Sequence, residues 1–184
     1  KVRIFHDKNA TGYSILRKLM KKVIEVTGDD VVILGCSLPV QCGADIAPAM
    51  RIGVDIHNHW SHVYWIAESL KYTWMYNNKV TRIDPDFLVV RGEETANEPL
   101  VWEGEFNNFT PPQKAEEKDG DCFKRHWRHG NQFNAIEAET WANLVAVVGG
   151  NIFLSDRMSV LNERGISIIK NAFDITGNMG KPRH

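Results

Sequence analysis

Short apolar runs alternate along this chain with amphipathic segments of helical period, and this alternation constrains the fold more than any other feature. The apolar runs are the predicted strands, at 31–34, 50–55, 87–90 and 151–154. The segments with helical period are the predicted helices, at 12–27, 60–76, 137–148 and 159–173. Strands that are apolar throughout suit burial on both faces, so the pattern predicts an α/β fold with a parallel sheet.

The length limits how much of such a fold is present. A (β/α)₈ barrel needs about 250 residues, whereas this chain has 184 residues and four predicted strands. It therefore fits either a small open sheet or part of a barrel. The stretch 91–132 interrupts the alternation with three prolines, a charge cluster and five aromatic residues. We interpret it as a folded insert within one domain that spans residues 1–184.

The charge balance excludes two broad classes of partner. Lys plus Arg number 22 and Asp plus Glu number 23, which gives a net charge of −1. A balanced surface argues against a general nucleic-acid binder and against a polybasic membrane binder. The longest apolar runs are also far too short to span a bilayer. The three cysteines have irregular spacing and indicate neither a disulfide framework nor a compartment.

Polar residues repeatedly follow the predicted strands. Cys36 and Ser37 come after the first strand, the second carries Arg51 and ends at Asp55, and the fourth ends at Asp156. The carboxyl ends of parallel strands meet at the edge of the sheet where α/β enzymes place their active sites. The pattern therefore predicts a polar pocket, as in α/β enzymes of many kinds.

Four motifs give this pattern a more specific meaning. They are Gly-Cys-x-x-Pro at 35–39, Arg-Ile-Gly-x-Asp at 51–55, Asp-Pro-Asp at 84–86 and Gly-Gly-x-x-x-x-Ser-Asp at 149–156. In this order and spacing they resemble the α-galactosidase (melibiase) group of glycoside hydrolases, family 36, to which family 27 is related. The resemblance covers roughly residues 5–92 and 137–173.

This resemblance implies a retaining α-glycosidase in a TIM-type (β/α)₈ barrel, with this chain supplying the second half, strands five to eight. Two carboxylates about 5–5.5 Å apart do the chemistry in such enzymes, one as nucleophile and one as acid/base. Asp55 matches the acid/base position. An acid must hold its proton near neutral pH, which an ionised partner and partial burial favour. The family's nucleophile stands in a Lys-x-Asp-Phe motif, which is expected upstream of Lys1 and does not occur in this chain.

The resemblance also implies a substrate and a set of binding residues. The substrate is a terminal α-galactoside, in an oligosaccharide or a glycoconjugate, and neither a metal nor a cofactor is needed. Arg51 matches a sugar-contacting arginine, whose fork of donors suits hydroxyl groups, and Cys36 matches a position that lines the sugar subsite. The predicted substrate-binding set is Cys36, Ser37, Arg51, Trp60, Asp86 and Asp156.

A half barrel has consequences for assembly. It leaves two sheet edges unpaired, which is an aggregation hazard. We therefore expect oligomerisation or a further stretch of chain, with the other barrel half in the same polypeptide or in another chain. The isolated chain is expected to be incomplete and inactive.

Simpler roles compete for several of these residues. Asp55 could cap the helix that follows it, and Cys36 could be a small core residue. A turn around Pro85 explains Asp84 and Asp86, and Asp156 could cap the last helix. The histidines at 57, 59 and 62 invite a metal site, but no nearby carboxylate or cysteine completes one for zinc.

Two other functions remain open. One is a carbohydrate-binding or scaffold remnant of such a barrel without catalysis, which the missing nucleophile motif favours. The other is a complete small open-sheet α/β protein of a different class, such as a phosphate-dependent enzyme. A sheet that is complete by itself and has its own topological switch point would favour this last alternative.

Overall fold

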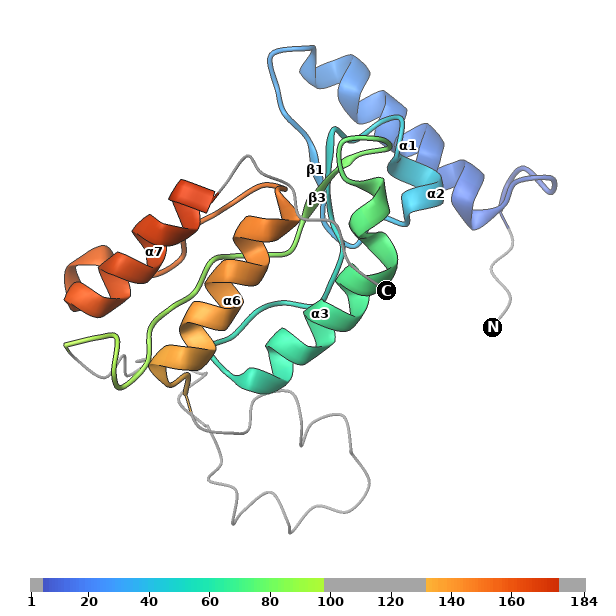
Figure 1. Ribbon diagram of the computed structural model, residues 1–184. Helices are drawn as coiled ribbons and strands as arrows, with labels where there is room; N and C mark the ends of the chain where they lie inside the picture. Colours follow the sequence, from blue (N-terminus) through green and yellow to red (C-terminus); the bar gives the residue numbers. More distant parts are fainter. Residues whose placement is uncertain (1–4, 98–131, 176–184) are drawn as a thin grey trace, which may run out of the picture.

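The computed structural model describes residues 5–97 and 132–175 (Figure 1). Three short strands form a parallel sheet in the order β1 (Leu34–Gly35), β2 (Ala49–Arg51) and β3 (Arg82–Asp84). An isolated parallel bridge between Leu88 and Leu154 adds a further contact of the same direction beyond β3. The register of β2 against β3 sets Arg51 opposite Asp84, so these last residues of two neighbouring strands meet at the carboxyl edge of the sheet.

Five α-helices lie in the described ranges. They are α1 (Gly12–Thr27), α2 (Val40–Gly43), α3 (Trp60–Thr73), α6 (Ala135–Val148) and α7 (Glu163–Ile175), with short 3₁₀ turns η1 (Trp74–Tyr76) and η3 (Met158–Val160). α1 has the predicted bounds, and the other long helices differ from the predicted ranges by a few residues at their ends. The hydroxyl of Thr11 accepts the backbone N–H of Ser14 and so caps α1, while Gly28, at φ 75°, ends it.

The predicted strand at 31–34 is wrong in its bounds. Only Leu34 belongs to β1, while Val31 and Val32 are 51% and 79% exposed. Pairing with β2 begins at Leu34 and Ala49. Pro48 precedes Ala49, and a proline has no N–H with which to extend the ladder. An apolar β-branched run therefore lies outside the sheet that its composition favours.

The predicted strands at 50–55 and 87–90 also need correction. β2 ends at Arg51. Ile52 still donates its N–H to the backbone oxygen of Asp84 at 3.1 Å, and residues 53–55 continue outside the strand. The third strand is β3 at 82–84, which ends on the first residue of the Asp-Pro-Asp motif. After the motif, the predicted strands at 87–90 and 151–154 are joined by the isolated parallel bridge between Leu88 and Leu154. The sequence of β3, Arg-Ile-Asp, has one apolar residue between two charges, so hydropathy gives no strand signal. Asp84 can nevertheless be buried there because it faces the guanidinium of Arg51.

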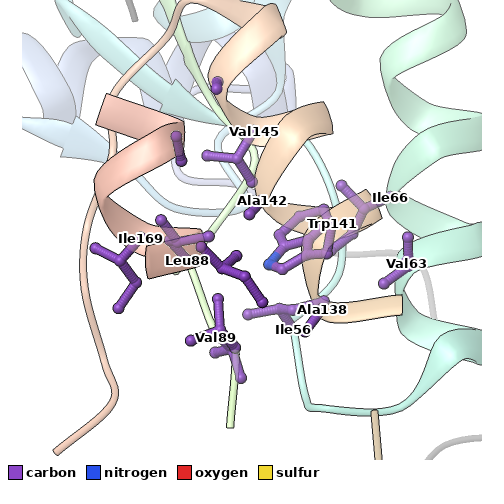
Figure 2. Close-up of a cluster of buried hydrophobic side chains, with 14 of the residues drawn as sticks. Ile56, Val63, Ile66, Leu88, Val89, Ala138, Trp141, Ala142, Val145 and Ile169 are labelled. Carbon is purple, nitrogen blue, oxygen red and sulfur yellow. The ribbon is translucent and has the colours of Figure 1, made fainter. Parts of the chain in front are cut away.

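The main core lies where α6 packs between α3 and α7 (Figure 1). Its buried side chains come from these helices and from the extended segment 87–90, as Figure 2 shows for Trp141, Val63, Ile66 and Leu88. Trp141 is fully buried, and its indole N–H donates to the backbone oxygen of Phe87 at 3.2 Å. This bond satisfies the polar atom of a large buried ring and ties α6 to the segment after β3.

A second, smaller core holds the amino-terminal part. Its buried residues are Leu38, Cys42, Ala47 and Met50, and Leu16 and Met20 of α1 pack against them in part. None of the residues of α1 is fully buried. α1 is therefore held by one apolar stripe and by the ion pair between Arg17 and Asp45.

The Gly-Gly pair after α6 has a packing reason. Gly149 ends the helix in the left-handed conformation, at φ 67°. A side chain at Gly150 would bring its Cβ within 2.1 Å of the backbone oxygen of Ile83 in β3. The pair lets the chain turn from α6 and run close against the sheet.

A half barrel of strands five to eight stays a prediction. Most of the predicted insert at 91–132 lies outside the described residues, which stop at 97 and resume at 132.

Candidate functional site

The carboxyl edge of the sheet carries a cluster of four charged residues, here called the Arg51 cluster, in which Arg51 is surrounded by three aspartates. Its guanidinium Nη1 lies 2.7 Å from Asp86 and 3.1 Å from Asp55, and its Nε lies 3.5 Å from Asp84. The Arg51 side chain is 12% exposed and those of Asp84 and Asp86 are 4% and 3% exposed, whereas that of Asp55 is 66% exposed. One cation thus joins two buried carboxylates to a third that reaches solvent.

Asp86 is the most constrained member of the Arg51 cluster. Its Oδ2 accepts the backbone N–H of Ile56 at 2.6 Å, and its Oδ1 accepts that of Phe87 at 2.8 Å. Its own N–H donates to Oδ1 of Asp84 at 2.9 Å across Pro85, so the predicted turn is confirmed. Burial raises the pKa of Asp86, against the opposing effects of the two backbone donors and of Arg51.

Asp55 has an exposed side chain, while its backbone is held by hydrogen bonds. The partial burial expected of an acid/base residue is not found, because the side chain is 66% exposed and lies beside the guanidinium of Arg51. The backbone N–H that follows Asp55 is bound by Asp86, and the carbonyl oxygen of Asp55 lies 2.7 Å from Nδ1 of His62. The capping alternative for Asp55 is wrong, because α3 begins at Trp60 with His59 as its N-cap residue. This arrangement can present the carboxyl group of Asp55 to a ligand at the edge of the sheet, with the guanidinium of Arg51 beside it.

Two other predicted residues follow a neighbouring strand, and a third begins α3. Cys36 and Ser37 follow β1, the strand next to β2, and both are exposed. The alternative of Cys36 as a core residue is therefore wrong; of the two cysteines in the part of the chain that the structure describes, Cys42 is the buried one. Ser37 has φ 55°, an unusual conformation for a residue with a side chain. Trp60 opens α3 and is 45% exposed, so its ring is open to contact. Their roles in sugar binding stay predictions.

Asp156 lies in a separate buried pair with Arg91. Its Oδ1 is 2.5 Å from Nη1 of Arg91, and its Oδ2 accepts the backbone N–H groups of Val90 and Arg91. Its side chain is fully buried and both oxygens are occupied. It does not cap the last helix, because α7 begins at Glu163 and the side chain of Asn162 accepts the N–H of Gly165. The structure does not bring Asp156 into the Arg51 cluster.

The histidines near the site form no metal centre in the described residues. No group of three His, Cys, Asp or Glu side chains there could hold a metal ion. His62 is 2% exposed, and its ring is edge-on to that of His57, with centroids 4.9 Å apart. The contact of His62 with Asp55 is the part of the site that sequence reasoning missed. It joins residues seven apart across a loop, for which no sequence pattern is diagnostic.

A hollow of about 530 Å³ lies at the opposite, amino edge of the sheet. Residues that line it include Ala49, Thr81 and Arg82 at the starts of β2 and β3, and none of the predicted site residues. In parallel α/β folds the amino edge serves stability and the carboxyl edge serves chemistry. The Arg51 cluster is therefore the better candidate site.

A comparison of the sequence with models of known protein families finds none that matches. In residues 5–97 and 132–175, no helix combines the length and apolar character needed to cross a membrane. The assignment of a function accordingly depends on the motifs and on the geometry around Asp55.

Proposed function

We propose that this chain carries the acid/base residue, Asp55, of a retaining glycoside hydrolase that cleaves terminal α-galactosidic bonds. The observation that supports this most directly is the placement of Asp55 beyond the carboxyl end of β2. Its carboxyl group is 66% exposed while the backbone beside it is bonded to buried side chains. A proton donor has to reach the substrate and yet keep a fixed position.

The reaction would proceed in two steps. The protonated carboxyl of Asp55 gives its proton to the glycosidic oxygen while a carboxylate outside this chain attacks the anomeric carbon, and the bond to the leaving group breaks. The Asp55 carboxylate then takes a proton from water as that water attacks the anomeric carbon. The bond between this carbon and the nucleophilic carboxylate breaks, and the sugar is released. Both steps transfer only a proton and a glycosyl group, so neither step needs a redox cofactor or a metal.

Arg51 has a clear place in this scheme. Its guanidinium is anchored by Asp86, and its Nη1 also contacts Asp55. It can hold the Asp55 carboxylate after the proton has left and can donate to a sugar hydroxyl at the same edge. Cys36, Ser37 and Trp60 are proposed as further walls of the sugar site.

The test is Asp55→Ala in the protein that combines this chain with its nucleophile-bearing barrel half. We expect a loss of kcat between about 10²-fold and 10⁴-fold on an α-galactosyl disaccharide. The loss should be smaller for a dinitrophenyl α-galactoside, whose leaving group needs little protonation, and azide should restore part of the turnover. Asp30→Ala, which changes an exposed aspartate in the turn after α1, is the matched control.

Unchanged hydrolysis of the disaccharide by Asp55→Ala would remove Asp55 from the mechanism. Galactose binding by calorimetry without any turnover, in wild type and variant alike, would instead support the non-catalytic carbohydrate-binding alternative.

A further inference from the structure

One peptide group beside the proposed acid is held at both of its polar atoms. The peptide bond between Asp55 and Ile56 carries the carbonyl oxygen of Asp55 and the N–H of Ile56. The oxygen lies 2.7 Å from Nδ1 of His62, and the N–H donates to Oδ2 of Asp86 at 2.6 Å. Because a peptide group is planar, two bonds on opposite sides fix its orientation. They thereby restrict the backbone torsion next to the Cα of Asp55.

The two side chains that hold this peptide come from different elements and are both buried. His62 lies in the first turn of α3 and is 2% exposed, and Asp86 follows β3 with a side chain that is 3% exposed. Water has little access to compete for either bond. The loop 52–59 is thus tied to the helix on one side and to the sheet on the other.

The bond to His62 also fixes a proton on its ring. A carbonyl oxygen can only accept, so Nδ1 must carry the hydrogen and donate it. An uncharged ring then exists as the Nδ1–H tautomer, the less common form for a free imidazole. This gives the contact a spectroscopic signature that simple packing would not produce.

We infer that His62 is a positioning residue for the proposed acid: it donates Nδ1–H to the carbonyl oxygen of Asp55 and, with Asp86, holds the peptide that presents the Asp55 carboxyl to the substrate. The catalytic part of this inference rests on the proposed function. The two hydrogen bonds that fix the peptide between Asp55 and Ile56 do not depend on the proposed function, because they are part of the fold.

The experiment compares His62→Leu, which removes the donor but keeps an apolar side chain, with His62→Asn, whose amide N–H₂ stands near the position of Nδ1. In the same two-part protein, His62→Leu should lower kcat between about 10-fold and 100-fold with little change in KM. His62→Asn should recover most of that loss. In the Asp55→Ala background, His62→Leu should have little further effect, because the group that it positions is gone.

A readout independent of activity accompanies the kinetics. In wild type, ¹⁵N NMR of the His62 ring should show the proton on Nδ1, and the ¹³C′ resonance of Asp55 should shift in His62→Leu and return in His62→Asn. A proton on Nε2 alone, or an unchanged Asp55 resonance in His62→Leu, would overturn the inference. So would an equal loss of kcat from His62→Leu with Asp55 present and absent. If wild type shows no glycosidase activity but the NMR result holds, the proposed function fails and the hold on the peptide stands.

Discussion

Two arginine–aspartate groups lie at the carboxyl ends of the parallel segments, and they differ in how far they are enclosed. Arg91 and Asp156 form a closed pair: every oxygen of the carboxylate has a protein donor, and the Asp156 side chain is fully buried. Arg51 instead contacts three carboxylates, and one of them, on Asp55, is two-thirds exposed.

The difference separates a structural contact from a candidate for chemistry. A buried ion pair whose hydrogen bonds are complete has nothing left to offer a ligand, and breaking it leaves an uncompensated buried charge. The Arg51 cluster has an excess of carboxylates, and the guanidinium Nε makes no hydrogen bond although it is buried. Incomplete internal pairing beside an exposed carboxyl group is typical of sites that act on something external.

The largest effect that separates the two groups should come from Asp156→Ala. This change leaves the buried guanidinium of Arg91 and two backbone N–H groups without their acceptor, so we expect a loss of about 3–5 kcal/mol in the free energy of unfolding. Asp55→Ala removes an exposed carboxyl and should cost less than about 1 kcal/mol. Urea unfolding of both variants measures this contrast. Equal losses would show that the two groups do not differ as described.

A smaller effect is expected within the Arg51 cluster. In Asp86→Asn the amide fits the positive φ of 87° at this position, but its N–H₂ must face either the N–H of Phe87 or that of Ile56. We expect a loss of about 1–3 kcal/mol in the free energy of unfolding. Asp84→Asn is the comparison variant. Its amide oxygen can still accept the N–H of Asp86, and it loses the ion pair with Nε of Arg51, which at 3.5 Å is the longest of the three contacts of Arg51. A greater loss from Asp84→Asn than from Asp86→Asn would contradict this account of the cluster.

The smallest effect is a pH dependence of the Arg51 cluster that comes from Asp86. Burial raises the pKa of Asp86 above its ordinary value of 3.8, so the folded state binds this proton more tightly than the unfolded chain. The resulting stabilisation is fully present below pH 3.8 and is lost as the pH rises through the folded pKa.

Asparagine cannot titrate, so the comparison of wild type with Asp86→Asn isolates this contribution. The difference in unfolding free energy, wild type minus variant, should decrease as the pH rises from below 3.8 through the folded pKa. Denaturant unfolding at a series of pH values measures it. A difference that grows with pH would mean that Arg51 and the backbone donors outweigh burial.

The sequence predicted the helices better than the strands, for physical reasons. α1 has both an apolar stripe and its end signals, Thr11 and Gly28, so its bounds were predicted correctly. β3 has a single apolar residue, and its Asp84 is buried only because Arg51 faces it from the neighbouring strand. The hydropathy of one segment therefore does not predict that a charged residue in it is buried, when the partner that neutralises its charge lies in another segment.

The same distinction applies to the site. The sequence placed Arg51 and Asp55 four residues apart after one strand, and the structure brings them within 3.1 Å. The partners that depend on the tertiary fold were not predictable. Asp156 meets Arg91 across 65 residues, and His62 reaches the backbone of Asp55 only because of the path that the intervening loop takes.

The weak burial of α1 has a consequence for local unfolding of this molecule. With no fully buried residue of its own, α1 should detach in a local unfolding event well before α3, α6 and α7 separate. Such an event would expose to water the apolar side chains against which Leu16 and Met20 pack, including that of Met50, the neighbour of Arg51 in β2. Early cleavage or exchange in α1 would therefore report the fraying of one helix, while the packing around Trp141 persists.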